Sequence, residues 1–432
     1  MHSKIKIVDK KNLFPFVLIT SLFALWGFAN DITNPMVAAF RTIMEISNFK
    51  ASLIQLAFYG GYATMAIPAA LFIQKYSYKK GILLGLALYA FGALLFWPAA
   101  QFQIFGIFLG SLYILTFGLA FLETTANPFI LSLGAKETAT QRLNLAQAFN
   151  PMGSLLGMFV ASRLILAALV SDKQRNAVGE LIFSTLDETT KAAIRTNDLM
   201  IIRNPYVALG LVVIIMFVVI AMIKMPQSGQ VNKVDVRGSI KRLLANSLYR
   251  EGVIAQVFYV AAQIMCWTFI IQYAENMGID KATAQNYNIA AMFAFLIGRF
   301  VSTFLMKYIN ARKLLMWFAI AGMVTISCTI FIEGMPGLYF LIATSAFMSL
   351  MFPTIYGIAL GTVGNDVTMG SAGLVMAIVG GALMPPLQGA IIDLGRVGFL
   401  PAVNASFVLP LISFCVITVY GYRSFKKRLV VN

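Results

Sequence analysis

The chain has little charge, one histidine and three cysteines. Only 12% of its 432 residues are charged, against about 25% in soluble domains. The single histidine, His2, leaves no basis for histidine catalysis. Cys266, Cys328 and Cys415 all lie in apolar stretches and are odd in number, so we expect free thiols and neither disulfides nor a metal site. Walker, Rossmann and nucleophile-elbow motifs are missing as well, which predicts a protein that is not an enzyme and needs no cofactor.

Long apolar runs account for most of the sequence. Hydrophobic residues make up 59% of the chain and the mean hydropathy is +0.81. A helix that crosses a bilayer needs about 20 mostly apolar residues. Twelve such runs centre near residues 23, 62, 90, 117, 155, 213, 263, 294, 322, 348, 382 and 411. We therefore predict an all-α membrane protein with twelve transmembrane helices.

The net charge of +16 reflects membrane topology rather than nucleic-acid binding. Basic residues gather in short segments between apolar runs, and these alternate with segments that are poor in Lys and Arg. The basic segments are residues 4–11, 75–80, 224–250, 307–313 and 423–428. This pattern predicts that both termini and the central loop lie in the cytoplasm. The first apolar run has no evident cleavage site, so we expect no cleavable signal peptide.

Two halves of six spans each are predicted on either side of a basic linker. We assign residues 1–224 to an N-terminal six-helix bundle, 225–248 to a cytoplasmic linker and 249–432 to a C-terminal six-helix bundle. A polar stretch at 170–203 separates the fifth and sixth runs and should lie outside the cell. Its role is not evident from the sequence.

The two halves repeat weakly. FIQKY at 72–76 ends the second run and FLMKY at 304–308 ends the eighth, while Pro128 in the fourth run has a counterpart in Pro353 of the tenth. Parallel six-helix repeats related by an axis along the membrane normal are the layout of the major facilitator fold. Substrate sites in such folds lie near the midplane, between the halves.

Glu123 is the most informative residue because it lies inside the apolar stretch 107–133. A carboxylate at membrane depth costs about 3 kcal/mol on insertion scales, so such residues usually face a partner or a hydrated cavity. The alternative is a structural carboxylate bonded to a neighbouring helix. The equivalent position in the tenth run falls near Met348, so the carboxylate is not a packing device shared by both halves. This asymmetry favours a function for Glu123.

The first span ends in Asn30-Asp31-Ile32-Thr33-Asn34-Pro35. Asp31 and Asn34 are three residues apart and therefore share a helix face. This face either lines the central site, where it binds substrate or relays a proton, or meets headgroup water at the outer end of the helix.

Neutral amides line the start of the fifth span, at Asn144, Gln147 and Asn150. An amide both donates and accepts hydrogen bonds, which suits a hydroxyl-rich ligand. Interhelical amide bonds, which stabilise membrane bundles, are an equally strong interpretation.

The seventh span carries a polar and aromatic stripe at helical spacing, Gln256, Tyr259, Gln263 and Trp267, which favours a cavity face over an interface anchor. Asn286 begins the eighth span with the same ambiguity as the amides of the fifth.

Arg299 lies deeper in the eighth span than a loop residue should, and we favour a structural or gating role for it over substrate contact. We assign Pro128 a structural or gating role as well. Asp366 and Asp393 lie near span ends and are expected to be helix caps or gate contacts.

The chain resembles the L-fucose:proton symporters of the major facilitator superfamily along nearly its whole length. The resemblance is carried by LFALW (22–26), SYKKG (77–81), LETTANPF (122–129), RLNLAQ (142–147), IGRF (297–300) and FPTI (352–355). Two of these motifs, E-x-x-A-N-P-F and RLNLAQ, are quite specific to this branch of the superfamily. The same branch includes permeases for glucose, galactose and N-acetylglucosamine.

The resemblance implies that Glu123 binds and releases the coupling proton and that the first span supplies a second acidic residue. The family pattern has Asn one turn before Asp, whereas this chain has Asp31 first and Asn34 in the usual Asp position. Carboxylate and amide are thus exchanged over about 5.4 Å. Asp31 serves as the second proton-coupling group, or Glu123 acts alone, and sodium coupling stays open beside proton coupling.

The predicted function is uptake of L-fucose or a related hexose with a proton, by alternating access. Asn34, Asn144, Gln147, Asn150, Tyr259, Gln263, Trp267 and Asn286 are the predicted sugar-binding residues. The expected setting is a monomer in lipid, spanning the bacterial inner membrane. The alternatives are a glucose/galactose or N-acetylglucosamine permease, a sodium-coupled or facilitative carrier, an exporter of another small molecule, and, from a different class, a membrane sensor.

Overall fold

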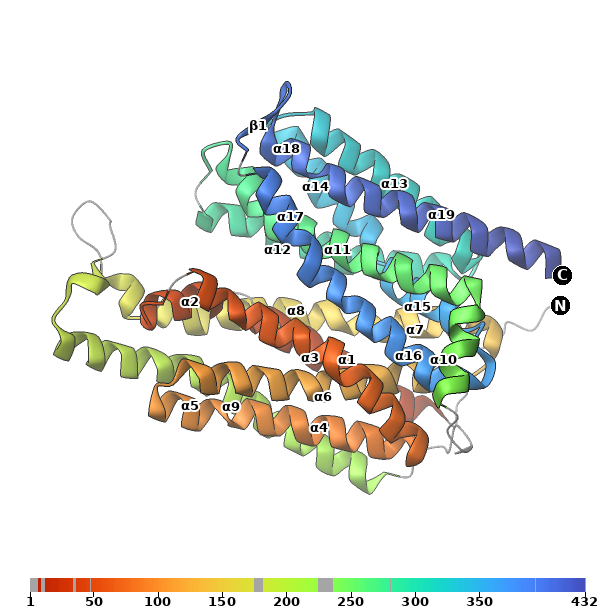
Figure 1. Cartoon of the computed structure of the whole chain (residues 1–432), viewed down its shortest axis with the longest axis horizontal. Coiled ribbons are helices and arrows are strands. Elements are labelled where there is room, and N and C mark those ends of the chain that lie inside the picture. The colour runs from red at the N-terminus through yellow and green to blue at the C-terminus, as the bar shows by residue number, and fades with distance from the viewer. Residues whose placement is uncertain are drawn as a thin grey trace.

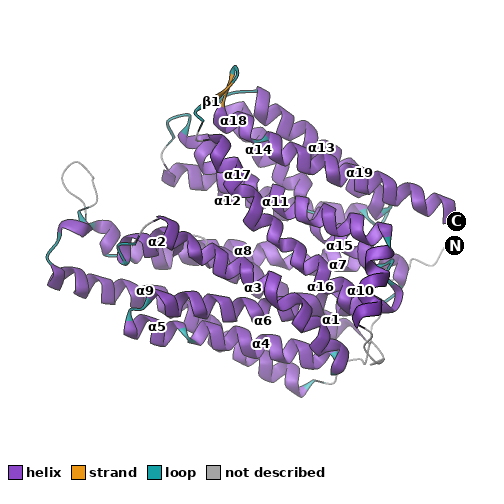
Figure 2. Ribbon diagram, viewed as in Figure 1, coloured by secondary structure: helices purple, strands orange, loops and turns teal. Residues whose placement is uncertain are grey.

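The computed structural model describes residues 7–8, 12–33, 36–46, 48–174, 182–223, 236–279, 281–392 and 394–431. Helices dominate these residues (Figure 2). Twelve segments among them are long and apolar enough to cross a membrane, and each contains one of the predicted centres. The prediction of an all-α protein with twelve transmembrane helices is confirmed.

The described residues of the first half contain six spans. Their α-helices are α1 (Leu13–Thr33), α2 (Met36–Ile43), α3 (Asn48–Lys75), α4 (Tyr78–Leu94), α5 (Phe96–Phe102), α6 (Phe105–Ser132), α7 (Ala139–Gln147), α8 (Phe149–Val160) and α9 (Glu188–Met222). The short turns are η2 (Lys136–Thr138), η3 (Ala161–Ile165), η4 (Leu166–Ala168), η5 (Ser171–Lys173) and η6 (Phe183–Thr185).

The second half contains the other six spans. Its helices are α10 (Val236–Ala245), α11 (Ser247–Glu275), α12 (Lys281–Leu305), α13 (Ala311–Phe331), α14 (Met335–Met348), α15 (Met351–Leu360), α16 (Val367–Met376), α17 (Gly380–Ile392), α18 (Ala402–Ser406) and α19 (Val408–Val431). The turns η7 (Gly364–Asp366) and η8 (Ala377–Val379) flank α16, and β1 (Arg396–Val397) pairs antiparallel with β2 (Leu400–Pro401).

The two halves form separate helical bundles that meet on one side of the molecule (Figure 1). We call this side, where α1 begins and α19 ends, the terminal side. Here α3 and α6 of the first half contact α16 of the second, and α7 contacts α12 and α15. Toward the opposite side, the far side, the ribbons of the two bundles diverge (Figure 1).

The predicted linker 225–248 contains a helix, α10, that is tied to the second half. Arg242 pairs with Asp366 at 2.8 Å, and the Ser239 hydroxyl donates to the same carboxylate at 2.6 Å. Asp366 is therefore held by the linker helix, as a contact residue near a span end. Asp393 lies outside the described residues.

The sixth span is longer than its apolar run suggested. The stretch 170–203 has a polar composition, yet α9 begins at Glu188. Asp187 starts this helix by accepting a hydrogen bond from the Thr190 amide at 2.9 Å, which also lowers the pKa of Asp187. Buried Asp198 accepts from the amides of Val170 and Ser171 at 2.9 and 2.8 Å. These bonds attach the segment after η4 to the side of α9.

Glycines let α1 and α8 approach closely. A Cβ atom on Gly153 would lie 1.8 Å from the carbonyl oxygen of Ala24, and one on Gly27 would lie 2.0 Å from that of Asn150. Small residues at such crossings let two helix backbones pack without side chains between them. The crossing fixes α8, and with it the amides at the end of α7, against the first span.

Candidate functional site

Glu123 lies in the second half of α6 and is half-buried. Its neighbours Thr124, Thr125 and Asn127 are fully buried. Among the described residues, no basic side chain pairs with the Glu123 carboxyl group. The site therefore places no fixed positive charge beside this group.

Two tyrosines, one from each half, lie within electrostatic range of Glu123. They are Tyr62 of α3 and Tyr356 of α15. Tyr59, one turn before Tyr62, is in turn within range of Asp31, which is buried in α1. Adjacent turns of α3 thus place one tyrosine near each of the two predicted proton-coupling carboxylates.

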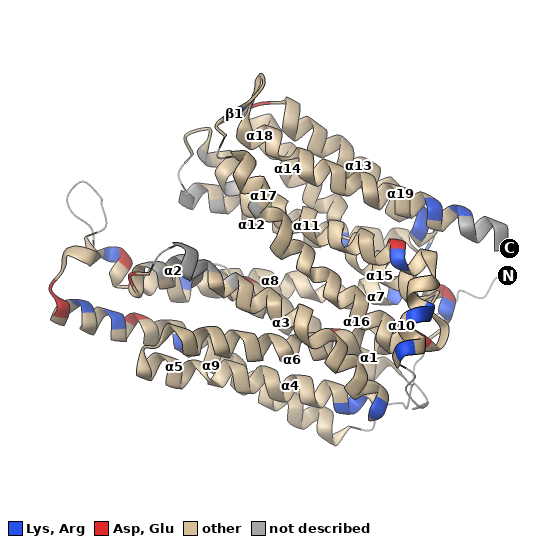
Figure 3. Cartoon of the chain, in the orientation of Figure 1, with Lys and Arg blue, Asp and Glu red and all other residues tan. Residues whose placement is uncertain are grey.

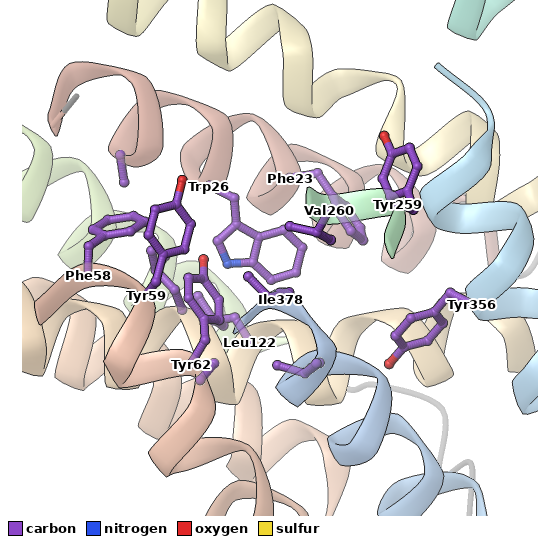
Figure 4. Packing of buried hydrophobic residues seen from close by; sticks show 14 of the residues in the cluster. Phe23, Trp26, Phe58, Tyr59, Tyr62, Leu122, Tyr259, Val260, Tyr356 and Ile378 are labelled. Carbon is purple, nitrogen blue, oxygen red and sulfur yellow. The ribbon is translucent and has the colours of Figure 1, made fainter. Parts of the chain in front are cut away.

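Trp26 of α1 lies beside these tyrosines. Figure 4 shows the rings of Tyr59, Tyr62 and Trp26 gathered together, with Tyr259 and Tyr356 farther along the interior. The indole nitrogen of Trp26 is buried and has no hydrogen-bond partner among the described residues. The interior next to the two carboxylates therefore presents aromatic faces together with an unused donor.

A hydrogen-bond network runs from the turn after Glu123 into the second half. Gln147 Nε2 donates to Asn127 Oδ1 at 2.9 Å. On the other side of this turn, the Tyr356 hydroxyl of α15 bonds the hydroxyl of Ser371 on α16. Ser371 Oγ donates to the carbonyl oxygen of Thr124 at 2.8 Å. Residues on α7, α15 and α16 therefore all bond to the part of α6 that follows Glu123.

The amides of α7 face other protein groups. Asn144 is fully buried and donates to Thr354 Oγ1 of α15 at 3.1 Å, across the two halves. Gln141 donates to the carbonyl oxygen of Thr303 in α12 at 3.0 Å. Both Asn144 and Gln147 form interhelical amide bonds, the second of the two interpretations left open by the sequence. Gln147 does so at the turn that follows Glu123.

Asn150 is half-buried at the crossing of α8 with α1. Its amide donates to the carbonyl oxygen of Phe23 at 3.2 Å. This bond joins two helices of the same half, unlike that of Asn144.

The stripe on α11 divides into a buried and a half-buried part. Gln256 and Tyr259 are fully buried, and within the described residues neither amide atom of Gln256 nor the Tyr259 hydroxyl has a hydrogen-bond partner. Gln263 and Trp267 are half-buried. Trp267 Nε1 donates to Ser345 Oγ at 3.2 Å, and its ring stands edge-on to that of Phe295.

Arg299 is 3% exposed, although it carries a full charge. Its guanidinium lies 4.9 Å from the centre of the Phe295 ring, and Nη1 is 3.5 Å from the carbonyl oxygen of Gln147 in the other half. Pro151 has no N–H to donate to that carbonyl, which leaves it available. Arg299 therefore contacts the other half through the backbone, an arrangement compatible with its predicted gating role.

One predicted sugar-binding residue stands apart from the others, and one lies outside the described residues. Asn286 is exposed near the start of α12, and the rise of a helix places it about 20 Å from Arg299 along the same axis. Asn34 lies outside the described residues.

Sequence reasoning missed three hydroxyl-bearing residues of the second half, Thr354, Tyr356 and Ser371. Thr354 was within a recognised motif, FPTI, and Tyr356 follows it directly. Nothing in the sequence pairs Ser371 with Thr124, which is 247 residues away.

Residues 17–384 match the family model of the Major Facilitator Superfamily. The chain belongs to this superfamily of membrane proteins. It is 64% identical over 423 residues to the L-fucose-proton symporter of Haemophilus influenzae, covering 98% of this chain and 99% of the relative. It is 35% identical over 424 residues to the L-fucose-proton symporter of Escherichia coli, covering 96% and 94%.

The fold agrees with these relatives. The crystal structure of the transporter FucP in the outward conformation superimposes with a TM-score of 0.85 at 33% identity, covering 96% of this chain and 99% of the other. Within the superfamily, the chain thus falls in the L-fucose-proton symporter family. The predictions of the family and of a transporter rather than an enzyme are confirmed.

Proposed function

We propose that this protein imports L-fucose together with a proton by alternating access, and that Glu123 carries the proton. The observation that carries the proposal is the setting of Glu123. It is the carboxylate of an apolar span, it has no basic partner among the described residues, and tyrosines of both halves flank it. The named activity of the two relatives supports the choice of L-fucose and of the proton.

The proposed cycle starts with Glu123 neutral and the far side open. L-fucose binds, and the two bundles rock about the site. On the terminal side Glu123 meets water, loses its proton, and the sugar leaves. Passage of the sugar with Glu123 charged is costly because the occluded state is dry, and this cost couples sugar entry to proton entry. The empty carrier then returns and takes up the next proton.

The contacts between α7, α15, α6 and α16 support a state closed on the terminal side. Similarity to an outward conformation agrees with this assignment. We infer that the terminal side is cytoplasmic, because basic residues at the starts of α4 and α10 and toward the end of α19 gather there (Figure 3). The cytoplasmic termini, the inner membrane as location and the monomeric state all remain parts of this proposal.

For the sugar we propose the half-buried residues Gln263 and Trp267 of α11, with Asn150 of α8. Their side chains are reachable, whereas Asn144 is fully buried in the contact between halves. An indole face suits the apolar face of a sugar ring, and amides suit its hydroxyl groups. Asn34, Tyr259, Asn286 and Gln147 remain candidates for contacts in other states of the cycle. Asp31 is proposed as the second acidic residue of the proton path.

The test is uptake of labelled L-fucose into proteoliposomes under an inward proton gradient. We expect accumulation that disappears when a protonophore collapses the gradient. Proton-driven uptake of glucose, galactose or N-acetylglucosamine in place of L-fucose would support proton coupling and refute L-fucose as the substrate. Accumulation that follows a sodium gradient and ignores the proton gradient would refute proton coupling.

A further inference from the structure

Ser371 contacts the turn that bears Glu123 through an acceptor that only a proline makes available. Pro128 lies inside α6 and has no N–H, so the carbonyl oxygen four residues earlier, that of Thr124, lacks its helical donor. Ser371 Oγ occupies this position at 2.8 Å. The donor comes from α16 of the opposite half, and both residues are fully buried.

The same serine also bonds a tyrosine that lies near Glu123. The Tyr356 hydroxyl bonds Ser371 Oγ, and Tyr356 lies within electrostatic range of the Glu123 carboxyl group. Because Thr124 follows Glu123 directly in the chain, any motion that separates Ser371 from Thr124 also rearranges the groups around Glu123.

We propose that Ser371 is a positioning residue which holds the terminal side closed through the Pro128-freed carbonyl of Thr124, and which couples opening of that side to the Glu123 site. The proposal rests on the proposed function for its coupling part only. The closing part concerns conformation and stands without any assumption about proton transfer.

An independent contact of the same kind lies nearby. Pro151 leaves the carbonyl of Gln147 without a helical donor, and Arg299 of the other half approaches it at 3.5 Å. Two prolines of the first half thus expose backbone acceptors that the second half uses. A neighbouring helix commonly satisfies a carbonyl freed by proline in a membrane protein; here the neighbour belongs to the opposite half.

The closing part is tested by distances between spin labels on the terminal side. Labels at Lys80→Cys and Lys313→Cys, both exposed and in opposite halves, report opening by double electron–electron resonance in sugar-free protein with the native cysteines replaced. Ser371→Ala should lower the ratio of closed to open molecules about fivefold, the effect of losing one buried hydrogen bond. Pro128→Ala should act in the same direction, because its new N–H competes for Thr124.

Matched variants separate the contact from general disturbance. Ser413→Ala removes a buried serine hydroxyl that bonds its own helix at 3.0 Å, and Pro205→Ala removes a proline inside α9; neither should alter the ratio. Ser371→Thr keeps the hydroxyl and should retain the wild-type ratio of closed to open molecules. An unchanged distance distribution in both Ser371→Ala and Pro128→Ala would overturn the proposal.

The coupling part is tested by the pH dependence of L-fucose binding to the purified protein. Ser371→Ala should shift its midpoint and Ser371→Thr should restore it, whereas Ser413→Ala leaves it in place. Label distances that change without any shift would overturn the coupling part alone. If Glu123→Gln retains the full pH dependence, the proposed function itself fails, whatever the label distances show.

Discussion

The two halves repeat the same six-span plan but differ in where they place acidic groups. The first half buries Asp31 and half-buries Glu123 within its spans, while the position matching Glu123 in the second half falls near Met348, which is fully buried and apolar. The second half instead supplies neutral hydroxyl groups, Tyr356 and Ser371, to the Glu123 turn.

This difference separates the titrating group from the groups that respond to it. A single carboxylate can change the contact between halves only if the other half carries partners sensitive to its state. Symmetry of fold thus coexists with asymmetry of chemistry, and variants that remove the asymmetry should be the most damaging.

The largest expected effect comes from giving the second half its own carboxylate. Met348→Glu buries an acidic group at the end of α14 and should lower the free energy of unfolding by about 3 kcal/mol. Thermal unfolding of the purified protein measures this. Met348→Leu, which preserves the apolar character, should stay close to wild type; equal stability of Met348→Glu and wild type would show that the two halves do not differ in this respect.

Next in size is the loss of a contact between halves. Asn144→Ala removes the bond to Thr354 at 3.1 Å and leaves a buried hydroxyl without its donor, at a cost of about 2 kcal/mol. The terminal-side label distance should shift toward the open state.

Asn150→Ala is the companion to this variant, because its amide bonds Phe23 within one half. It should leave the label distance unchanged and instead weaken L-fucose binding, if Asn150 contacts the sugar as proposed. An equal shift of the label distance in Asn144→Ala and Asn150→Ala would show that the closed state does not depend specifically on contacts between the halves.

A smaller effect is expected from Tyr356→Phe. The ring remains and only the hydroxyl that bonds Ser371 is lost. The initial rate of proton-driven L-fucose uptake should fall about three- to tenfold, in line with the loss of one buried hydrogen bond. Exchange of internal for external sugar across the vesicle membrane, measured without a proton gradient, should be less affected. An equal loss of this exchange would argue for a purely structural role of the hydroxyl.

The smallest effect belongs to Tyr206→Phe, which changes only the first half. Tyr206 bonds Thr33 at 2.9 Å and its ring stacks on Phe96 at 3.8 Å. Losing the hydroxyl should cost about 1 kcal/mol in thermal stability, with the ratio of accumulated to external sugar unchanged. A fall in that ratio would show that packing within the first half also controls coupling.

The twelve spans and the position of Glu123 inside one of them were predictable because both are local signals. Apolar length identifies a span, and a single carboxylate stands out inside one. The sixth helix was harder, since a polar stretch continues helically when a cap such as Asp187 and buried bonds such as those of Asp198 support it.

The partners of the Glu123 turn could not be predicted in this way. Ser371 and Thr124 are 247 residues apart, and Asn144 and Thr354 are 210 apart. Serine and threonine are common in spans, and no periodicity marks the few that bond across the halves. The sequence identified the amides on α7 as polar groups within a span, where a sugar site could lie. Only the fold distinguishes an amide that contacts another helix from one that contacts the sugar.

The most direct test of the central claim is proton movement driven by sugar alone. L-fucose is added outside vesicles that have no proton gradient, and the external pH is recorded for wild type and for Glu123→Gln. Asp172→Asn, at an exposed position, is the control. We predict alkalinisation of the medium with wild type and the control, and none with Glu123→Gln even though labelled sugar still enters. Alkalinisation of wild-type size with Glu123→Gln would contradict the account, because the proton would then move without that carboxylate.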